Sequence, residues 1–92
     1  SMTDKTRTVA VLGTAADPPT IAHQQLMWLA RPHFDEVWVM PCFKHMFGKV
    51  MTDPYHRLRR CELMVDHLGQ WAKASDFEIK NKLQLPTVDV YT

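Results

Sequence analysis

The first half of the chain alternates between strand-like and helix-like patterns of hydrophobic residues. Residues 8–12 (TVAVL) are apolar and rich in β-branched side chains, which predicts a strand. Residues 22–30 carry apolar side chains at helical spacing after Thr20, a good N-cap, and Pro32 ends this helix. Residues 36–40 (EVWVM) predict a second strand. A helix between two strands predicts a right-handed crossover with parallel strands.

The second half of the chain predicts a longer helix and a third strand. Asp53 is a good N-cap that is followed by proline, and Gly69 is expected to end the helix. Residues 75–83 (SDFEIKNKL) predict an edge strand with Phe77 and Ile79 pointing inward. The expected apolar stripe of the long helix consists of Tyr55, Leu58, Cys61, Val65 and Leu68.

These elements predict one α/β domain in the order strand, helix, strand, helix, strand. The expected fold is a Rossmann-like parallel sheet with flanking helices. We expect residues 1–7 to be a tag remnant and a disordered N-terminus, and residues 8–92 to form the domain.

The composition of the 92 residues excludes several classes of protein. The chain is 46% hydrophobic and 23% charged, with a formal net charge of +1, which is typical of a globular domain and not basic enough for a general nucleic-acid binder. No apolar run approaches the roughly 20 residues that cross a bilayer. The cysteines, Cys42 and Cys61, lack metal-ligand spacing and are expected to be reduced thiols. We therefore expect a cytoplasmic protein that binds neither nucleic acid nor membrane and holds no metal of its own.

The joint between the first strand and the first helix indicates a phosphate site. Gly13 is able to adopt backbone conformations that other residues avoid, and the helix after Thr20 begins with unpaired N–H groups and a partial positive charge. His23, in the first turn, is suited to stabilise negative charge that builds on a phosphate. The same pattern is also typical of a plain turn followed by a surface histidine.

A second group of candidates lies between residues 42 and 52. This loop leaves the carboxyl end of the second predicted strand, the edge at which open α/β sheets bind ligands. It carries Lys44, His45 and Lys49, which favours phosphate binding, although a loop lysine is commonly a solvated charge.

Cations also crowd the start of the long helix, where they oppose the helix dipole. A bound anion would relieve this repulsion, which makes Arg57 a further candidate phosphate ligand. Ion pairs with Glu62 or Asp66, or exposure to solvent, are an equal alternative for these arginines.

The stretch GTAADPPTIAH (13–23) resembles the Gly-x-x-Phe-Asp-Pro-x-His/Thr-x-Gly-His signature of the nucleotidyltransferases. Together with VWVMPCFKHMFGK, it is most similar to the nicotinate- or nicotinamide-mononucleotide adenylyltransferases, and the resemblance covers nearly all of the chain. Ala16 stands where the family usually has an aromatic residue, and Ala22 where it usually has glycine. Thr20 in place of the first histidine is a variant found in this branch.

The resemblance implies adenylyl transfer from ATP to a pyridine mononucleotide in NAD biosynthesis, with release of pyrophosphate. Magnesium is expected to be carried with ATP. Phe47-Gly48-Lys49 matches an element that contributes a lysine to the phosphates, so Lys49 is the first choice for that role, ahead of Lys44 and His45. The other implied phosphate-site residues are Gly13, Thr14, Ala15 and Thr20, with His23 at the α-phosphate.

The family also has a fourth strand beside the first and a later Ile-Ser-x-Thr-x-x-Arg motif, and this sequence contains neither. The chain is therefore expected to be the N-terminal half, truncated before the fourth strand. Two alternatives stay open. In the first, the enzyme uses another acceptor, such as phosphopantetheine or a cytidylyl-transfer substrate. The Phe-Gly-Lys element argues against this alternative. Otherwise the chain is a non-catalytic nucleotide-binding fragment that forms a homo-oligomer through the open edge of its first strand.

Overall fold

A computed structural model describes residues 6–45 and 47–83 and contains one parallel sheet. Its strands are β1 (Val9–Thr14), β2 (Glu36–Pro41) and β3 (Ala72–Ala74), in the spatial order β1-β2-β3. The helices are α1 (Ile21–Ala30), the short 3₁₀ helix η1 (Arg31–His33), α2 (Pro54–Asp66) and α3 (Phe77–Lys80). The expected α/β architecture with parallel strands and flanking helices is confirmed.

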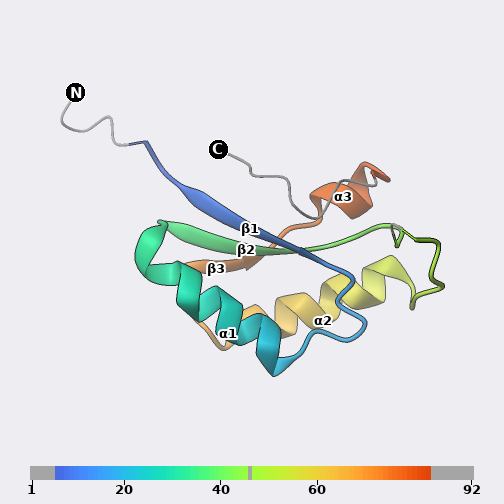
Figure 1. Cartoon of the computed structure of the whole chain (residues 1–92), viewed down its shortest axis with the longest axis horizontal. Coiled ribbons are helices and arrows are strands. Elements are labelled where there is room, and N and C mark those ends of the chain that lie inside the picture. The colour runs from blue at the N-terminus through green and yellow to red at the C-terminus, as the bar shows by residue number, and fades with distance from the viewer. Residues whose placement is uncertain (1–5, 46, 84–92) are drawn as a thin grey trace.

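Two successive right-handed crossovers explain the layers of the fold. Because β2 lies beside β1 and β3 lies beside β2 in the same direction, right-handed connections carry both α1 and α2 to the same face. Figure 1 shows α1 and α2 along one side of the sheet and α3 on the other. The core between the sheet and the two long helices is formed by buried side chains that include Met27, Val37, Val39, Cys61, Val65 and Ala72.

The ends of α2 follow from its capping residues. Asp53 Oδ1 accepts a hydrogen bond from the backbone N–H of Tyr55 at 2.8 Å, so the predicted N-cap is confirmed. The helix ends at Asp66, and Gly69 instead occupies the turn to β3, with a φ of 130°. Gly69 is needed there because few other residues adopt this conformation.

The buried stripe of α2 differs from the predicted one. Tyr55 is exposed, whereas Arg57, Cys61, Met64 and Val65 are buried. These four positions follow helical spacing, so the face itself is a normal amphipathic stripe. The prediction was wrong about Tyr55 because it assigned inward positions only to apolar residues and therefore passed over an arginine.

The third strand is also not where the sequence pattern placed it. β3 is Ala72–Ala74, and residues within the predicted strand 75–83 form α3 instead. The Lys80 N–H donates to the Asp76 carbonyl at 2.7 Å, a helical hydrogen bond. Ile79 is buried while Phe77 is 49% exposed, so the two do not share an inward face. Over so few residues a single helical turn and a strand cannot be told apart by periodicity, and alanines have little β-propensity to reveal β3.

Within the described part of the chain, β1 is an edge strand of the sheet and pairs only with β2. An apolar groove of about 220 Å³ lies beside it, lined by residues of β1, α1 and β2 that include Val11, Leu26 and Met27. Self-association through this edge stays a prediction. No helix within the described ranges is long and apolar enough to cross a membrane.

Candidate functional site

The two candidate phosphate loops begin side by side at the carboxyl edge of the sheet. Thr14 and Pro41 are register partners at the ends of β1 and β2. Just beyond them, the Cys42 N–H donates to the Thr14 carbonyl at 2.9 Å. The parallel pairing therefore brings the loop after β1 (residues 15–20) next to the loop after β2 (residues 42–52), the arrangement from which ligand sites of open α/β sheets are built.

The His23 imidazole is held at both ring nitrogens. The backbone N–H of Thr20 donates to Nδ1 at 2.8 Å, and the Thr14 hydroxyl lies 2.9 Å from Nε2. Because Nδ1 accepts from a backbone N–H, hydrogen bonding assigns the proton of the neutral ring to Nε2, which donates to Thr14 Oγ1. The half-buried ring thus faces the glycine loop.

This arrangement depends on the start of α1. Thr20 is the N-cap, and its carbonyl accepts from the N–H groups of His23 and Gln24 at 3.0 and 3.3 Å. His23 is the third helical residue, the position from which a side chain reaches back to the N-cap N–H in a capping box. The same histidine therefore both stabilises the helix start and points into the loop.

Gly13 leaves open space at the end of β1 and does not adopt an unusual backbone conformation. It lies within β1, and its φ is not among the positive values, contrary to the conformational reason expected for this glycine. A Cβ at Gly13 would have no atom within 4 Å, so open space lies beside the strand end. The left-handed conformation occurs instead at Ala16, with a φ of 49°. Ala16 is buried in the core, where the resembled enzymes have an aromatic ring.

Arg57 is buried and hydrogen-bonded in a way that the sequence analysis did not predict. Its side chain is 1% exposed, and its guanidinium donates to four backbone carbonyls. Nε bonds the carbonyl of Thr52 at 2.7 Å, and Nη1 bonds those of Ala15 at 2.9 Å and Cys42 at 2.6 Å. Nη2 bonds the carbonyl of Phe43 at 3.2 Å. One buried side chain thus ties the loop after β1 to the loop after β2.

This placement differs from the ion pairs and the solvent exposure considered for Arg57, whereas its contact with a phosphate stays a prediction. It forms no ion pair with Glu62 or Asp66 in the described structure, and four hydrogen bonds leave only one of the five guanidinium N–H groups for a phosphate. The available sequence signal was helical spacing, because Arg57 precedes Cys61 by one turn on the buried face. The neighbouring arginines do form ion pairs, Arg59 with Glu62 at 3.7 Å and Arg60 with Asp17 at 3.7 Å.

Asp17 is a second connection between the loops. Its Oδ2 accepts from the Thr52 N–H at 3.0 Å. This hydrogen bond, supported by the nearby charges of Arg57 and Arg60, holds the pKa of Asp17 below its ordinary value. Asp17 therefore stays ionised and braces the loop.

The loop after β2 gathers the remaining candidates around a separate pocket. Lys44, His45 and Lys49 line a cavity of about 340 Å³ together with Thr52 and Arg57. Phe47, 84% exposed, stands over this loop, and its N–H donates to His45 Nδ1 at 3.1 Å. In the described ranges, neither Lys44 nor Lys49 forms an ion pair. The two loops that carry these candidates are joined by the hydrogen bonds of Arg57 and Asp17.

Cys42 begins the loop after β2, and the burial of its thiol disfavours the thiolate. Both cysteines are free. Burial raises the pKa of Cys42, and it raises the pKa of Cys61 to about 11. No cluster of three potential metal ligands occurs within residues 6–45 and 47–83.

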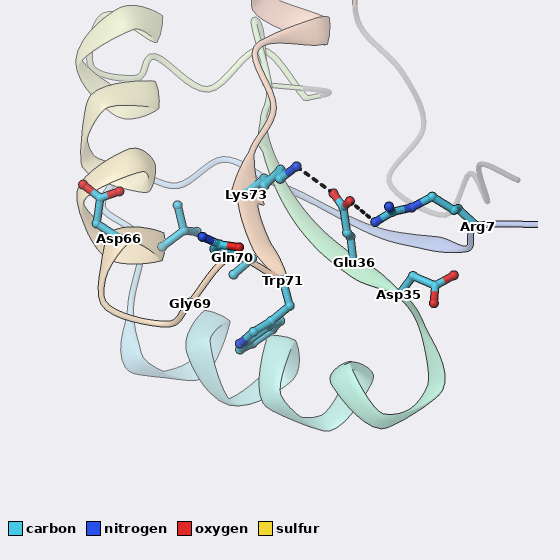
Figure 2. Close-up of a pocket in the computed structure, with 10 residues that line it drawn as sticks. Arg7, Asp35, Glu36, Asp66, Gly69, Gln70, Trp71 and Lys73 are labelled. Atoms are coloured by element: carbon cyan, nitrogen blue, oxygen red, sulfur yellow. Dashed lines mark hydrogen bonds and ion pairs between the residues drawn. The ribbon is translucent and has the colours of Figure 1, made fainter.

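A larger pocket of about 760 Å³ lies beside the opposite, amino edge of β2 and β3. Figure 2 shows Lys73 and Arg7 pointing at Glu36 from either side. Glu36 Oε1 also accepts from the Trp38 indole N–H at 2.9 Å. Both cations that line this pocket, Arg7 and Lys73, pair with Glu36, and none of the candidate phosphate residues lines it. We therefore take the carboxyl edge as the candidate site.

The charge cluster in Figure 2 predicts a stability effect of pH. The hydrogen bond from Trp38, followed by the bond and charge of Lys73, lowers the pKa of Glu36 from its ordinary 4.5. The stabilisation from Glu36 is therefore fully present above pH 4.5 and is lost as the pH falls through the lower folded-state pKa. Glu36→Gln should lower the free energy of unfolding at neutral pH by less than about 1 kcal/mol, because its partners are largely solvated.

Urea denaturation at neutral and acidic pH measures this effect. The difference between wild type and Glu36→Gln should shrink as the pH falls, whereas the exposed carboxylate variant Glu62→Gln should show a smaller difference throughout. If wild type and Glu36→Gln differed in free energy of unfolding by the same amount at both pH values, the lowered pKa of Glu36 would be contradicted.

Comparison with known proteins finds a matching family and several named relatives. A family model described as cytidylyltransferase-like matches residues 11–90. A protein of Myxococcus xanthus (strain DK1622), named probable nicotinate-nucleotide adenylyltransferase, is 38% identical over 88 residues, which cover 91% of this chain and 45% of that protein. A protein of the same name from Anaeromyxobacter dehalogenans (strain 2CP-C) is 41% identical over 59 residues, 62% of this chain and 32% of the relative. The chain spans less than half the length of these curated relatives.

Proposed function

The chain belongs to the cytidylyltransferase-like family of nucleotidyltransferases, and from this membership we propose that the whole protein transfers the adenylyl group of ATP to nicotinate mononucleotide. In this reaction an oxygen of the mononucleotide phosphate bonds to the α-phosphorus of ATP, and the bond from that phosphorus to pyrophosphate breaks. The products are a pyridine dinucleotide and pyrophosphate, so the protein would act in NAD biosynthesis in the cytoplasm.

The proposed reaction requires little covalent chemistry from the protein. The attacking phosphate is already an anion, so no general base is required. The protein has to align two anions and stabilise the charge of the transition state, which is what phosphoryl transfer depends on. Magnesium enters with ATP as part of the substrate.

The observation that carries the proposal is the position of His23. Its ring is fixed by Thr20 and faces the loop after β1, at the carboxyl edge of the sheet and beside the open space at Gly13. We assign the main-chain N–H groups around Thr14 and Ala15, with the N-cap Thr20, to phosphate binding, and His23 to stabilising charge on the α-phosphate.

The loop after β2 supplies the second part of the proposed site. Lys49, exposed beside its pocket, is assigned to the phosphate charge of ATP, with Lys44 and His45 as neighbours of the same pocket. Because Arg57 and Asp17 tie this loop to the loop after β1, the two halves of the site keep a fixed relation. A fixed relation between the loops suits a reaction in which the protein has to align two anions.

The test is a turnover assay on the whole protein with a panel of acceptors. Pyrophosphate release from ATP should be fastest with nicotinate mononucleotide, the acceptor indicated by the name of the relatives. Nicotinamide mononucleotide and phosphopantetheine serve as alternative acceptors, and CTP as the alternative donor. Turnover with phosphopantetheine or CTP but not with a pyridine mononucleotide would refute the proposal.

The role of Lys49 gives a separate prediction. Lys49→Ala should raise the KM for ATP about tenfold, with a smaller change in kcat, because a flexible exposed lysine contributes mainly uniform binding of the phosphates. Lys80→Ala, which removes an exposed lysine of α3, is the matched control. Initial-rate kinetics over a range of ATP concentrations decide the point, and equal KM values for the two variants would exclude Lys49 from the site.

A further inference from the structure

We propose that Arg57 is a positioning residue, which holds Lys49 over the phosphates of ATP by closing the neck of the loop after β2. This inference rests on the proposed function and adds a buried residue that acts on the KM for ATP through Lys49. The neck consists of Cys42 and Phe43, where the loop begins, and Thr52, where it ends before the N-cap of α2.

The guanidinium of Arg57 joins the two ends of this loop. Nη1 donates to the Cys42 carbonyl at 2.6 Å, and Nη2 donates to the Phe43 carbonyl at 3.2 Å. On the other side of the neck, Nε donates to the Thr52 carbonyl at 2.7 Å. One planar group thus holds the ends of the segment together, as at the neck of an Ω-loop. Because Arg57 is 1% exposed, these bonds are shielded from water.

The neck is also fixed to the rest of the candidate site. Nη1 of Arg57 donates to the Ala15 carbonyl at 2.9 Å, in the loop after β1. The Thr52 N–H donates to Asp17 Oδ2 at 3.0 Å, in the same loop. The base of Arg57 is rooted in α2, where its N–H donates to the Asp53 carbonyl at 3.1 Å. The neck therefore has a fixed position relative to the loop after β1.

The tip of the loop depends on the neck for its position. Residues 47–50 are all exposed, and Lys49 lies among them. The N–H groups of Phe47 and Gly48 form local hydrogen bonds, to His45 Nδ1 at 3.1 Å and to the His45 carbonyl at 3.0 Å. Lys49 and Arg57 line the same cavity of about 340 Å³. Loss of the guanidinium would let Lys49 leave the phosphates although Lys49 itself is unchanged.

A role of Arg57 in stability alone would not single out Lys49. Met64 provides the comparison, because it lies on the same buried face of α2, is 8% exposed and packs in the core. Met64→Ala should destabilise the protein by removing buried atoms, but it leaves the neck hydrogen bonds in place. Arg57→Lys keeps the charge, but one ammonium cannot bond carbonyls on several sides of a planar fork. The two variants therefore separate loss of stability from loss of the neck.

A double-mutant cycle in the whole protein tests the positioning role. In the wild-type background, Lys49→Ala should raise the KM for ATP about tenfold. In an Arg57→Lys background, where Lys49 is already displaced, Lys49→Ala should raise this KM by less than about threefold. In a Met64→Ala background the two sites are independent, so the rise should again be about tenfold.

The possible results separate this inference from the proposed function. A tenfold rise in the Arg57→Lys background would show that Arg57 only stabilises the fold, and it would overturn the inference while Lys49 keeps its proposed role. An unchanged KM for Lys49→Ala in the wild-type background would refute the proposed role of Lys49, and the positioning role with it.

Hydrogen exchange examines the neck without substrate or turnover. The Thr52 amide is protected by its bond to Asp17, and Arg57 holds the carbonyl of the same residue. Arg57→Lys should speed exchange of this amide about tenfold through local opening, whereas Met64→Ala should leave this local opening unchanged. An exchange rate in Arg57→Lys equal to that of wild type would show that the neck stays closed without the guanidinium.

Asp17 gives a second variant should Arg57→Lys fail to fold. Asp17→Ala keeps the guanidinium but releases the Thr52 N–H at the end of the neck. In this background Lys49→Ala should raise the KM for ATP by less than about fivefold, whereas Asp17→Asn, whose amide oxygen still accepts, should preserve the tenfold rise. A tenfold rise in both backgrounds would show that the neck does not position Lys49.

Discussion

Replacing His23 by alanine is expected to lower pyrophosphate release by the whole protein about 10²- to 10³-fold, the size of effect that follows loss of one preorganised donor at a developing anion. The physical reason is the fixed position of the ring, because the Thr20 N–H holds Nδ1 at 2.8 Å and leaves Nε2 facing the loop after β1. The loss should fall mainly on kcat, because charge on the α-phosphate is greatest in the transition state.

His23 also has a structural role, which the experiment has to separate from the chemical one. Alanine removes the acceptor for the Thr20 N–H and should cost about 1 kcal/mol of stability as a lost cap. His23→Gln restores the capping box, since glutamine at this position accepts from the N-cap N–H. We expect His23→Gln to be as stable as wild type in urea but still impaired in turnover.

His33→Ala is the control for changing an exposed histidine, in this case one in η1. It should leave pyrophosphate release within about twofold of wild type, as is usual for surface substitutions. Undiminished turnover in both His23 variants would remove the imidazole from the mechanism.

Replacing Arg57 by methionine is expected to destabilise the protein by about 3 to 5 kcal/mol, a large share of the roughly 5–15 kcal/mol that keeps a domain folded. Methionine fills much of the same space but donates no hydrogen bond. Four half-buried carbonyls, from Ala15, Cys42, Phe43 and Thr52, would lose this donor at once. The midpoint of urea unfolding measures the loss.

Two further substitutions test whether the geometry of the Arg57 hydrogen bonds, and not its charge alone, stabilises the protein. Arg57→Lys keeps the charge but cannot reach four carbonyls that lie around a planar fork, so it should recover only part of the stability. Arg59→Met, which removes an exposed arginine two residues further along α2 on a different face, should change the free energy of unfolding by less than about 0.5 kcal/mol. If Arg57→Met unfolded at the same urea concentration as wild type, the clamp would not stabilise the two loops.

Local signals made the first half of the fold predictable. The β-branched residues of 8–12, the N-cap Thr20 and the run EVWVM each act through their own backbone and near neighbours, and the structure contains β1, α1 and β2 at these places. The cap at Asp53 is equally local. The strand predicted at 75–83 failed because β3 is formed by pairing with Val37 and Val39, which are distant in sequence, and its alanines carry no signal of their own.

The sequence by itself determined the parallel α/β arrangement, the helix caps and the family signature that directs attention to His23 and Lys49. Only the tertiary structure decided that Arg57 is a buried clamp, that Gly13 provides space and that Thr14 completes the hydrogen bonding of His23. The physical reason is range: propensity and capping act within a few residues, whereas a buried charge or a hydroxyl proton is satisfied by partners that the fold brings from elsewhere. The bond from Arg57 to Ala15 spans 42 residues, and no local pattern contains it.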